Sequence, residues 1–299
     1  MGYPVVAGDG ARGMTAFPTR RHLLSFAAAA LAAGVLPRRA GARPLDDVVA
    51  AGRLMVAVYR DNPPFSYRKG GALVGVDVDL ARAIAGRLGV GVEFMELTAG
   101  EAVSDDLRNA VWRGPVVGGG VADVMMHVPY QKEFGLRNPE AVLFGPYQRE
   151  GFALARNPMR MTQPMLASLP DEPVGVEIDS IPDFYLLGAF GGRLRERLVH
   201  YMTIPEAVEA LVKGDVAAVV ATQSQVEAAL GDRAAGFPIT PVTFPGMMAS
   251  SWDIGMAVKE NSRDLAYAVG DAVTAMLEDG TLPEIFRKHG VTHNAIPVE

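Results

Sequence analysis

The sequence predicts an α/β protein of two lobes. The chain has 299 residues, of which 49% are hydrophobic. This length is too great for one small hydrophobic core and is about right for two α/β lobes. From Leu54 to Leu97 an apolar segment, an amphipathic segment and a second apolar segment follow one another, as in a βαβ unit. The same alternation returns after residue 174, so we expect a second lobe.

Residues 1–42 have the pattern of a twin-arginine export signal. Arg20-Arg21 precede an apolar run, Leu23–Leu36, of about 14 residues, which is too short to span a bilayer comfortably. Small residues then end the segment, and we expect cleavage near Ala42 and a periplasmic location. A membrane anchor with a basic flank is the alternative, and Met14 is an alternative start to Met1.

Charge and cysteine content exclude several classes of function. Without residues 1–42 the chain keeps 23 basic and 33 acidic residues, a net charge of −10, which repels nucleic acid. The sequence has no cysteine, and therefore no disulfide, thiolate metal site or thiol nucleophile. No segment after residue 42 is long and apolar enough for a transmembrane helix, so we expect no stable membrane insertion.

The first lobe is expected to begin with a strand, a helix and a strand. Leu54–Tyr59 reads as a buried strand that stops before Pro63-Pro64. Val76–Leu88 has apolar residues at helical spacing. Asp77 lies in the first turn of that helix, where we expect it to cap free amides, while Asp79 faces solvent. Val90–Leu97 is the next strand, which makes the sheet parallel.

The remaining elements follow from the same periodicities. In the first half they are a helix and two strands: Asp105–Trp112, Val121–Val128 and Gly151–Ala155. In the second half they are strands and helices in alternation: Val174–Ile178, a helix capped by Asp179 or Ser180, Pro205–Lys213, Val216–Ala221, a helix from Ser224 or Gln225, Trp252–Val258, Ser262–Asp279 and Leu282–His289. We assign residues 43–148 and 253–299 to lobe 1, and residues 149–252 to lobe 2.

Two parts of the chain resemble the family 3 periplasmic solute-binding proteins. Gly75–Leu80 followed by Ala83–Ala85 is similar to the family signature, and Gly255–Lys259 with Leu277–Lys288 is similar to its closing strand and helices. The resemblance implies the type II periplasmic-binding-protein-like fold, with two hinge crossings between the lobes. It also implies a ligand between the lobes, at the carboxyl ends of the strands, and closure by hinge bending.

The residues that hold a zwitterion in that family are missing here. After Asp123–Met126 the family runs on to an arginine that grips the ligand carboxylate, but here His127 follows and the nearest arginine is Arg137. In the second lobe Thr222 stands where the family has an aspartate for the ammonium group. Because both ends of a zwitterion need a partner when they leave water, the sequence argues against ordinary amino-acid binding.

A narrower resemblance covers three segments of the first lobe. Arg108–Pro115, Gly118–Tyr130 and Glu140–Glu150 resemble the "J" accessory proteins (MoxJ/XoxJ type) of bacterial methanol-oxidation gene clusters. This resemblance implies a periplasmic helper whose partner is a methanol dehydrogenase that uses pyrroloquinoline quinone (PQQ), with or without a lanthanide. It assigns neither PQQ nor a lanthanide to this chain itself, for which no cofactor is expected.

The candidate residues are those expected at strand ends and at the cleft rim. The ligand-cleft candidates are Tyr59, Asp61, Asn62, Phe65, His127, Tyr130, Gln131, Lys132, Asp179, Ser180 and Thr222. Turn formation is an equal explanation for Asn62, and His127 is alternatively a histidine that only fixes its loop. Trp112 is the partner-docking candidate, with core packing as the alternative.

The sequence contains little that supports catalysis. It has no Gly-x-Ser-x-Gly elbow, no His-Glu-x-x-His motif and no histidine pair at metal-ligand spacing, so we expect neither an enzyme nor a metal site. The preferred hypothesis is an accessory factor of methanol dehydrogenase that acts by docking or by handling a small ligand. The alternatives are an ABC-transporter receptor for a solute that is not an amino acid and, last, a dehydratase-type enzyme of the same fold.

Overall fold

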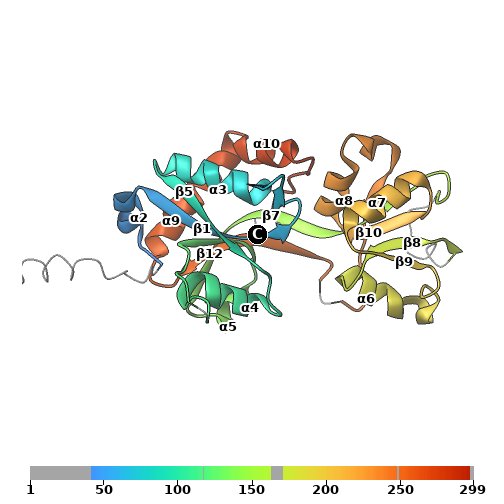
Figure 1. Cartoon of the computed structure of the whole chain (residues 1–299), viewed down its shortest axis with the longest axis horizontal. Coiled ribbons are helices and arrows are strands. Elements are labelled where there is room, and N and C mark those ends of the chain that lie inside the picture. Colours follow the sequence, from blue (N-terminus) through green and yellow to red (C-terminus); the bar gives the residue numbers. More distant parts are fainter. Residues whose placement is uncertain (1–41, 117, 163–170, 248, 297–299) are drawn as a thin grey trace, which may run out of the picture. The chain divides into compact units, whose positions relative to one another are not determined.

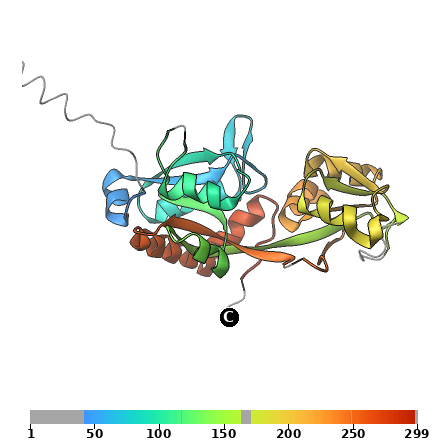
Figure 2. The ribbon, with the colours of Figure 1, turned by 90° about the horizontal axis from the view of Figure 1, so that it is seen from below.

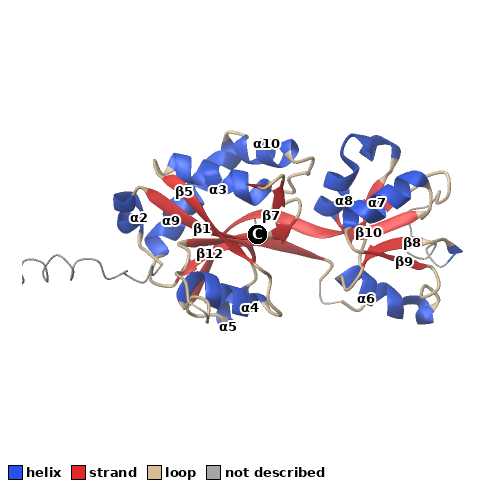
Figure 3. Cartoon of the chain, in the orientation of Figure 1, coloured by secondary structure: helices blue, strands red, loops and turns tan. Residues whose placement is uncertain are grey.

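The computed structural model describes residues 42–296, except residues 117, 163–170 and 248. The predicted export signal lies outside the described residues. Two lobes share one sheet in the order β5-β1-β6-β12-β7-β10-β8-β9, with β11 paired to β7 (Figures 1 and 3). The predicted two-lobed α/β fold is confirmed.

In lobe 1, parallel strands lie at the edge of the sheet and antiparallel strands join it to lobe 2. β1 (Arg53–Tyr59) pairs in parallel with β5 (Gly91–Leu97) and with β6 (Val124–Pro129). β12 (Ser251–Lys259) runs antiparallel to β6 and to β7 (Ala141–Arg156). β2 (Asp61–Asn62), β3 (Ser66–Lys69) and β4 (Ala72–Val74) form a separate small sheet.

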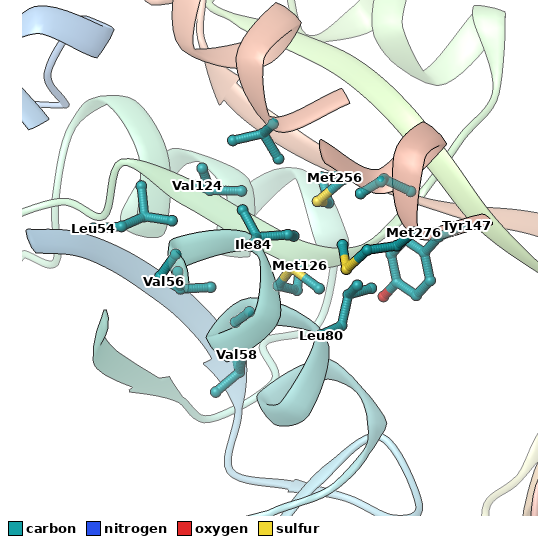
Figure 4. Packing of buried hydrophobic residues seen from close by; sticks show 14 of the residues in the cluster. Leu54, Val56, Val58, Leu80, Ile84, Val124, Met126, Tyr147, Met256 and Met276 are labelled. Carbon is teal, nitrogen blue, oxygen red and sulfur yellow. The ribbon is translucent and has the colours of Figure 1, made fainter. Parts of the chain in front are cut away.

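Helices cover both faces of the lobe 1 sheet, because alternate residues of a strand point to opposite faces. Leu54, Val56 and Val58 of β1 point toward the helices α3 (Val76–Arg87), α9 (Arg263–Glu278) and α10 (Thr281–Lys288). Figure 4 shows these three side chains with Leu80 and Ile84 of α3. On the other face Ala57 packs against α4 (Val103–Leu107), the π-helical turn η1 (Arg108–Trp112) and α5 (Lys132–Arg137).

The first described residues are fixed to the edge of this core. The Arg43 guanidinium donates to both oxygens of Asp123, from Nε at 3.0 Å and from its terminal nitrogen at 2.6 Å. Asp123 is 1% exposed and also accepts from the Met55 amide. Its charge is therefore paired, and α2 (Leu45–Ala51) follows directly.

Lobe 2 repeats the arrangement on a smaller scale. β10 (Ala218–Thr222), β8 (Val174–Glu177) and β9 (Leu198–Tyr201) run parallel, and β10 and β11 (Ile239–Pro241) both pair antiparallel with β7. α6 (Ile181–Gly188) and η3 (Ala189–Gly192) lie on one face. α7 (Ile204–Lys213), α8 (Gln223–Leu230) and η4 (Gly231–Gly236) lie on the other.

The long strands β7 and β12 connect the lobes, as both views of the ribbon show (Figures 1 and 2). The prediction of a separate strand at Gly151–Ala155 is wrong, because β7 begins at Ala141. Gly145 and Pro146 do not end it, since a register shift between Ile254 and Met256 of β12 forms a bulge opposite them. The lobe boundaries that we predicted near residues 148 and 253 fall inside β7 and β12, respectively.

Most other predicted elements are confirmed, with small changes at their ends. The predicted helix Asp105–Trp112 is α4 continued by the π-helical turn η1. Several short elements were not predicted, namely α2, β2 to β4, α5, η3, β9, η4 and β11. In the part of the chain that the structure describes, no helix is both long and apolar enough to cross a membrane.

Candidate functional site

The candidate site is where the strands of both lobes end and the lobes face each other. A cavity of about 500 Å³ joins residues of β2, β3 and the turn between them to the first turns of α7 and to α8. Its lining comprises Asp61, Asn62, Pro63, Pro64, Tyr67, Arg68, Glu177, Thr203, Ile204, Pro205, Gln225, Ala228 and Ala229. The volume is typical of small-molecule sites.

A second cavity, of about 160 Å³, lies on the lobe 2 side of the first one. Its lining comprises Phe152, Glu177, Ser180, Ile181, Pro182, Ile204, Ala221, Thr222, Gln225 and Trp252. Glu177, Ile204 and Gln225 line both cavities. Four predicted residues are therefore brought to adjoining cavities, namely Asp61, Asn62, Ser180 and Thr222.

Glu177 is the most informative residue of this region, and the sequence prediction missed it. It is the last residue of β8 and is half-buried. Among the described residues, none forms a hydrogen bond or ion pair with its carboxylate. Burial raises the pKa of the Glu177 carboxyl. The signal was its place at a strand end, which was obscured because the predicted strand was extended to Ile178.

The two hydroxyls in the smaller cavity are used mainly as helix caps. Ser180 is the N-cap of α6 and accepts a hydrogen bond from the Asp183 amide at 3.2 Å. Thr222 caps α8 in a capping box, in which its hydroxyl donates to Gln225 Oε1 at 2.9 Å.

Asp179 does not cap α6. It has a φ of 60° and its amide donates to Asp183 Oδ2, so it holds a left-handed turn at the rim.

His127 lies in the second half of β6 and is held by a buried polar cluster. Its Nδ1 is 3.1 Å from Asp77 Oδ2, and its amide donates to the Tyr147 hydroxyl at 3.2 Å. The Tyr147 hydroxyl in turn donates to Asp77 Oδ1 at 2.6 Å. The expectation that Asp77 caps its helix is wrong. Gly75 is the N-cap of α3, and Asp77 is fully buried because its two oxygens serve Tyr147 and His127.

Asp79 does not simply face solvent either. Its side chain is 16% exposed and pairs with Arg82, Lys288 and His289. These hydrogen bonds lower the pKa of Asp79, although burial opposes the shift. Asp79 therefore fixes α10 to α3.

Two predicted aromatic residues surround His127. Phe65 is 3% exposed, and its ring centroid lies 4.4 Å from that of His127 and 6.4 Å from that of Phe286. Tyr59 is partly buried and donates to Asp106 Oδ2 at 2.9 Å. Burial and the neighbouring Asp106 raise the pKa of Tyr59. Phe65 is thus a core residue that supports His127.

The remaining predicted residues belong to the surface of lobe 1. Gln131 is the N-cap position of α5 and Lys132 its first residue, and both are exposed. Tyr130 is 40% exposed, and its amide donates to the Asp253 carbonyl on β12. Trp112 is partly buried and packs against the cluster of Leu107 and Val111.

The C-terminal segment adds a third connection between the lobes, which we call the C-terminal strap (residues 291–294). The buried Gln148 of β7 bonds on both sides to it, donating to the Thr292 carbonyl and accepting from the Asn294 amide. The Arg149 amide donates to the Asn294 carbonyl at 3.0 Å. The Thr292 amide donates to Glu227 Oε2 of α8 at 2.7 Å. The strap therefore joins the hinge strand to lobe 2.

Neither cofactor implied by the narrower resemblance fits these residues. In the described parts of the chain, no three histidine, aspartate or glutamate side chains converge to hold a metal ion, whereas a lanthanide, as a hard cation, needs several oxygen ligands. PQQ carries carboxylates, and these would face the Glu177 carboxylate, for which the described residues provide no partner. The Arg68 guanidinium in the larger cavity is already bound to Glu96.

Part of the chain matches a known family, and solved structures share its fold. Residues 54–110 match the family described as bacterial extracellular solute-binding proteins, family 3. No curated protein matches the chain. A polar amino acid ABC uptake transporter substrate-binding protein from Streptococcus thermophilus is 15% identical, with a TM-score of 0.64, over 84% of this chain and 90% of that one.

Two ancestral proteins are also similar. An ancestral cationic amino acid solute-binding protein is 22% identical, with a TM-score of 0.62, over 82% of this chain and 99% of that one. An ancestral arginine-binding protein bound to arginine is 27% identical, with a TM-score of 0.50, over 79% and 97%. The chain therefore has the fold of the solute-binding proteins, and residues 54–110 carry the sequence features of family 3.

Proposed function

We propose that this protein is an exported accessory factor of a PQQ-dependent methanol dehydrogenase and that it acts by docking onto the enzyme. The observation that carries the proposal is the resemblance of residues 108–150 to the "J" accessory proteins. Within these residues, η1 and α5 lie on one face of the lobe 1 sheet, and β6 and the first part of β7 belong to the sheet itself. We propose docking rather than cofactor handling because neither PQQ nor a lanthanide fits the described cavities.

The exposed apolar side chains of this face support docking. Leu136 on α5 is 73% exposed and Tyr130 is 40% exposed, and Trp112 of η1 is partly exposed. We call Trp112, Tyr130 and Leu136 the lobe 1 docking face. Aromatic side chains with an apolar neighbour are common centres of protein interfaces.

Co-purification and native mass spectrometry with the dehydrogenase test the proposal. We expect a complex that Leu136→Glu weakens at least tenfold. Phe184→Glu, at a 62% exposed position in lobe 2, is the matched control and should leave the complex intact. No association, together with an unchanged yield of holo-enzyme when the gene is deleted, would refute the proposal.

A receptor for an ABC transporter is the second candidate. The cavities at the strand ends favour it, and so does the fold shared with amino-acid receptors. A thermal-shift screen separates the two candidates, since a tight ligand raises the melting temperature by mass action. A strong stabilisation by an ordinary nutrient, without binding to the dehydrogenase, would favour the receptor.

A further inference from the structure

The two adjoining cavities carry a charge that the proposed docking role does not use. The Glu177 carboxylate is half-buried, lines both cavities and has no partner among the described residues. An ionised carboxylate that is partly removed from water without a partner is unfavourable. A residue of this kind at the carboxyl end of a strand is therefore a candidate to receive a ligand.

The other charged groups of the larger cavity leave this negative charge uncompensated. The Arg68 guanidinium donates to both carboxylate oxygens of Glu96 and to the Gly71 carbonyl. Asp61 adds a second carboxylate, 83% exposed, whose nearest cation in the described chain is Arg60 at 3.7 Å. The cavity is therefore suited to a cation and unsuited to an anion.

The other walls suit the apolar body of an organic molecule. Phe152 and Trp252 line the smaller cavity with ring centroids 5.2 Å apart, and Ile204 lies between the two cavities. Aromatic faces attract alkylammonium and guanidinium groups as well as alkyl chains. In the smaller cavity, the Thr222 and Ser180 hydroxyls are already used in helix caps.

We propose that these cavities bind an organic cation without a carboxylate, such as an alkylamine or alkylguanidine, with Glu177 as the counter-charge. A carboxylate on the ligand would meet Arg68 only after displacing Glu96, and it would be repelled by Glu177. This distinguishes the ligand from a zwitterionic amino acid. The proposal stands apart from docking, since Glu177 lies in lobe 2 and the lobe 1 docking face does not include it.

Titration calorimetry of the full chain with butylamine, butane-1,4-diamine and butylguanidine tests the proposal, with butyrate and arginine as comparison probes. We expect at least one of the three cations to bind more tightly than both comparison probes. Glu177→Gln should weaken that binding at least tenfold, because a charge-assisted contact is lost.

Glu196→Gln is the matched control, because Glu196 is an exposed glutamate of lobe 2 that lines neither cavity. The Glu196→Gln variant should bind the cations with the affinity of the wild type. The melting temperatures of both variants report on whether they fold. Absence of binding by all three cations would overturn the proposal. Equal binding by wild type and Glu177→Gln, or tighter binding of arginine or butyrate, would also overturn it. None of these outcomes bears on association with the dehydrogenase.

Discussion

The Tyr147 hydroxyl donates a 2.6 Å hydrogen bond to the Asp77 carboxylate, which ties the hinge strand β7 to the first turn of α3. Both side chains are buried, at 2% and 0% exposure. Burial and the neighbouring carboxylate raise the pKa of Tyr147 well above its usual range, so the phenol stays protonated and remains a donor. This bond also positions the Asp77 carboxylate, whose second oxygen contacts the His127 ring.

Tyr147→Phe should therefore lower the free energy of unfolding by about 2 kcal/mol, because a charge-assisted hydrogen bond is lost and Asp77 loses a buried donor. Urea unfolding measures the change. Tyr267→Phe, at a 72% exposed position, should have no measurable effect. Equal stability of the two variants would mean that the bond contributes nothing.

Thr222 can be tested as a helix cap and as a site residue at once. Thr222→Ala should cost about 1 kcal/mol, since the capping box of α8 is lost, whereas Thr222→Asp keeps a capping oxygen and should retain the stability. Because no arginine replaces the missing family residue after β6, Thr222→Asp alone should not create micromolar affinity for glycine or alanine. Thermal denaturation and calorimetry measure both effects, and tight amino-acid binding would contradict the expectation.

The C-terminal strap should depend on the Gln148 side chain. Gln148→Ala removes the acceptor of the Asn294 amide and the donor to the Thr292 carbonyl, so amide exchange in residues 291–294 should accelerate at least tenfold. Hydrogen-exchange mass spectrometry measures this. Glu284→Ala on the exposed side of α10 is the control, and unchanged protection in Gln148→Ala would show that the strap is held by other contacts.

Glu177 should make stability and ligand binding respond to pH in opposite ways. Burial raises its folded pKa above the ordinary value, so the ionised form destabilises the folded chain at neutral pH, and this cost vanishes as the pH falls below the unfolded pKa. Glu177→Gln should therefore be the more stable form at pH 7, with the difference lost toward pH 4. Denaturant unfolding at both pH values measures it, with Glu196→Gln as control.

Affinity for the cationic probes should follow the opposite course. The carboxylate must be ionised to bind a cation, so affinity should fall as the pH drops through the raised pKa of Glu177. The affinity should begin to fall at a higher pH than it would if the counter-charge were an exposed glutamate. Calorimetry with butylamine between pH 7.5 and pH 4.5 measures it, and constant affinity over that range would exclude Glu177 as the counter-charge.

Most of the fold follows from local patterns in the sequence. Alternation in Leu54–Tyr59 and helical spacing in Val76–Leu88 predict β1 and α3, because each element has one buried face. The continuous strand β7 was not predictable in this way. A proline such as Pro146 usually ends a strand. Only the pairing of β7 with β12, which lies far along the chain, shows that a bulge accommodates this proline.

The candidate site was predicted less completely, for the same physical reason. The ends of strands indicated Asp61, Ser180 and Thr222, but a sequence does not show whether a polar side chain is already bonded. Ser180 and Thr222 turned out to be caps. Glu177 became informative only when the structure showed its burial and the lack of a partner for its carboxylate among the described residues. Asp77 became informative only when Tyr147 and His127 were placed beside it.

The ion pair between Arg43 and Asp123 has a consequence for maturation of an exported chain. If the predicted signal were cleaved after Ala42, Arg43 would become the first residue, and the nitrogen of its new ammonium group lies 3.3 Å from Asp123 Oδ1. Cleavage one residue further along would remove Arg43, which is the cation that pairs with the buried Asp123 among the described residues. A chain that lacks Arg43 should therefore be less stable than one that keeps it.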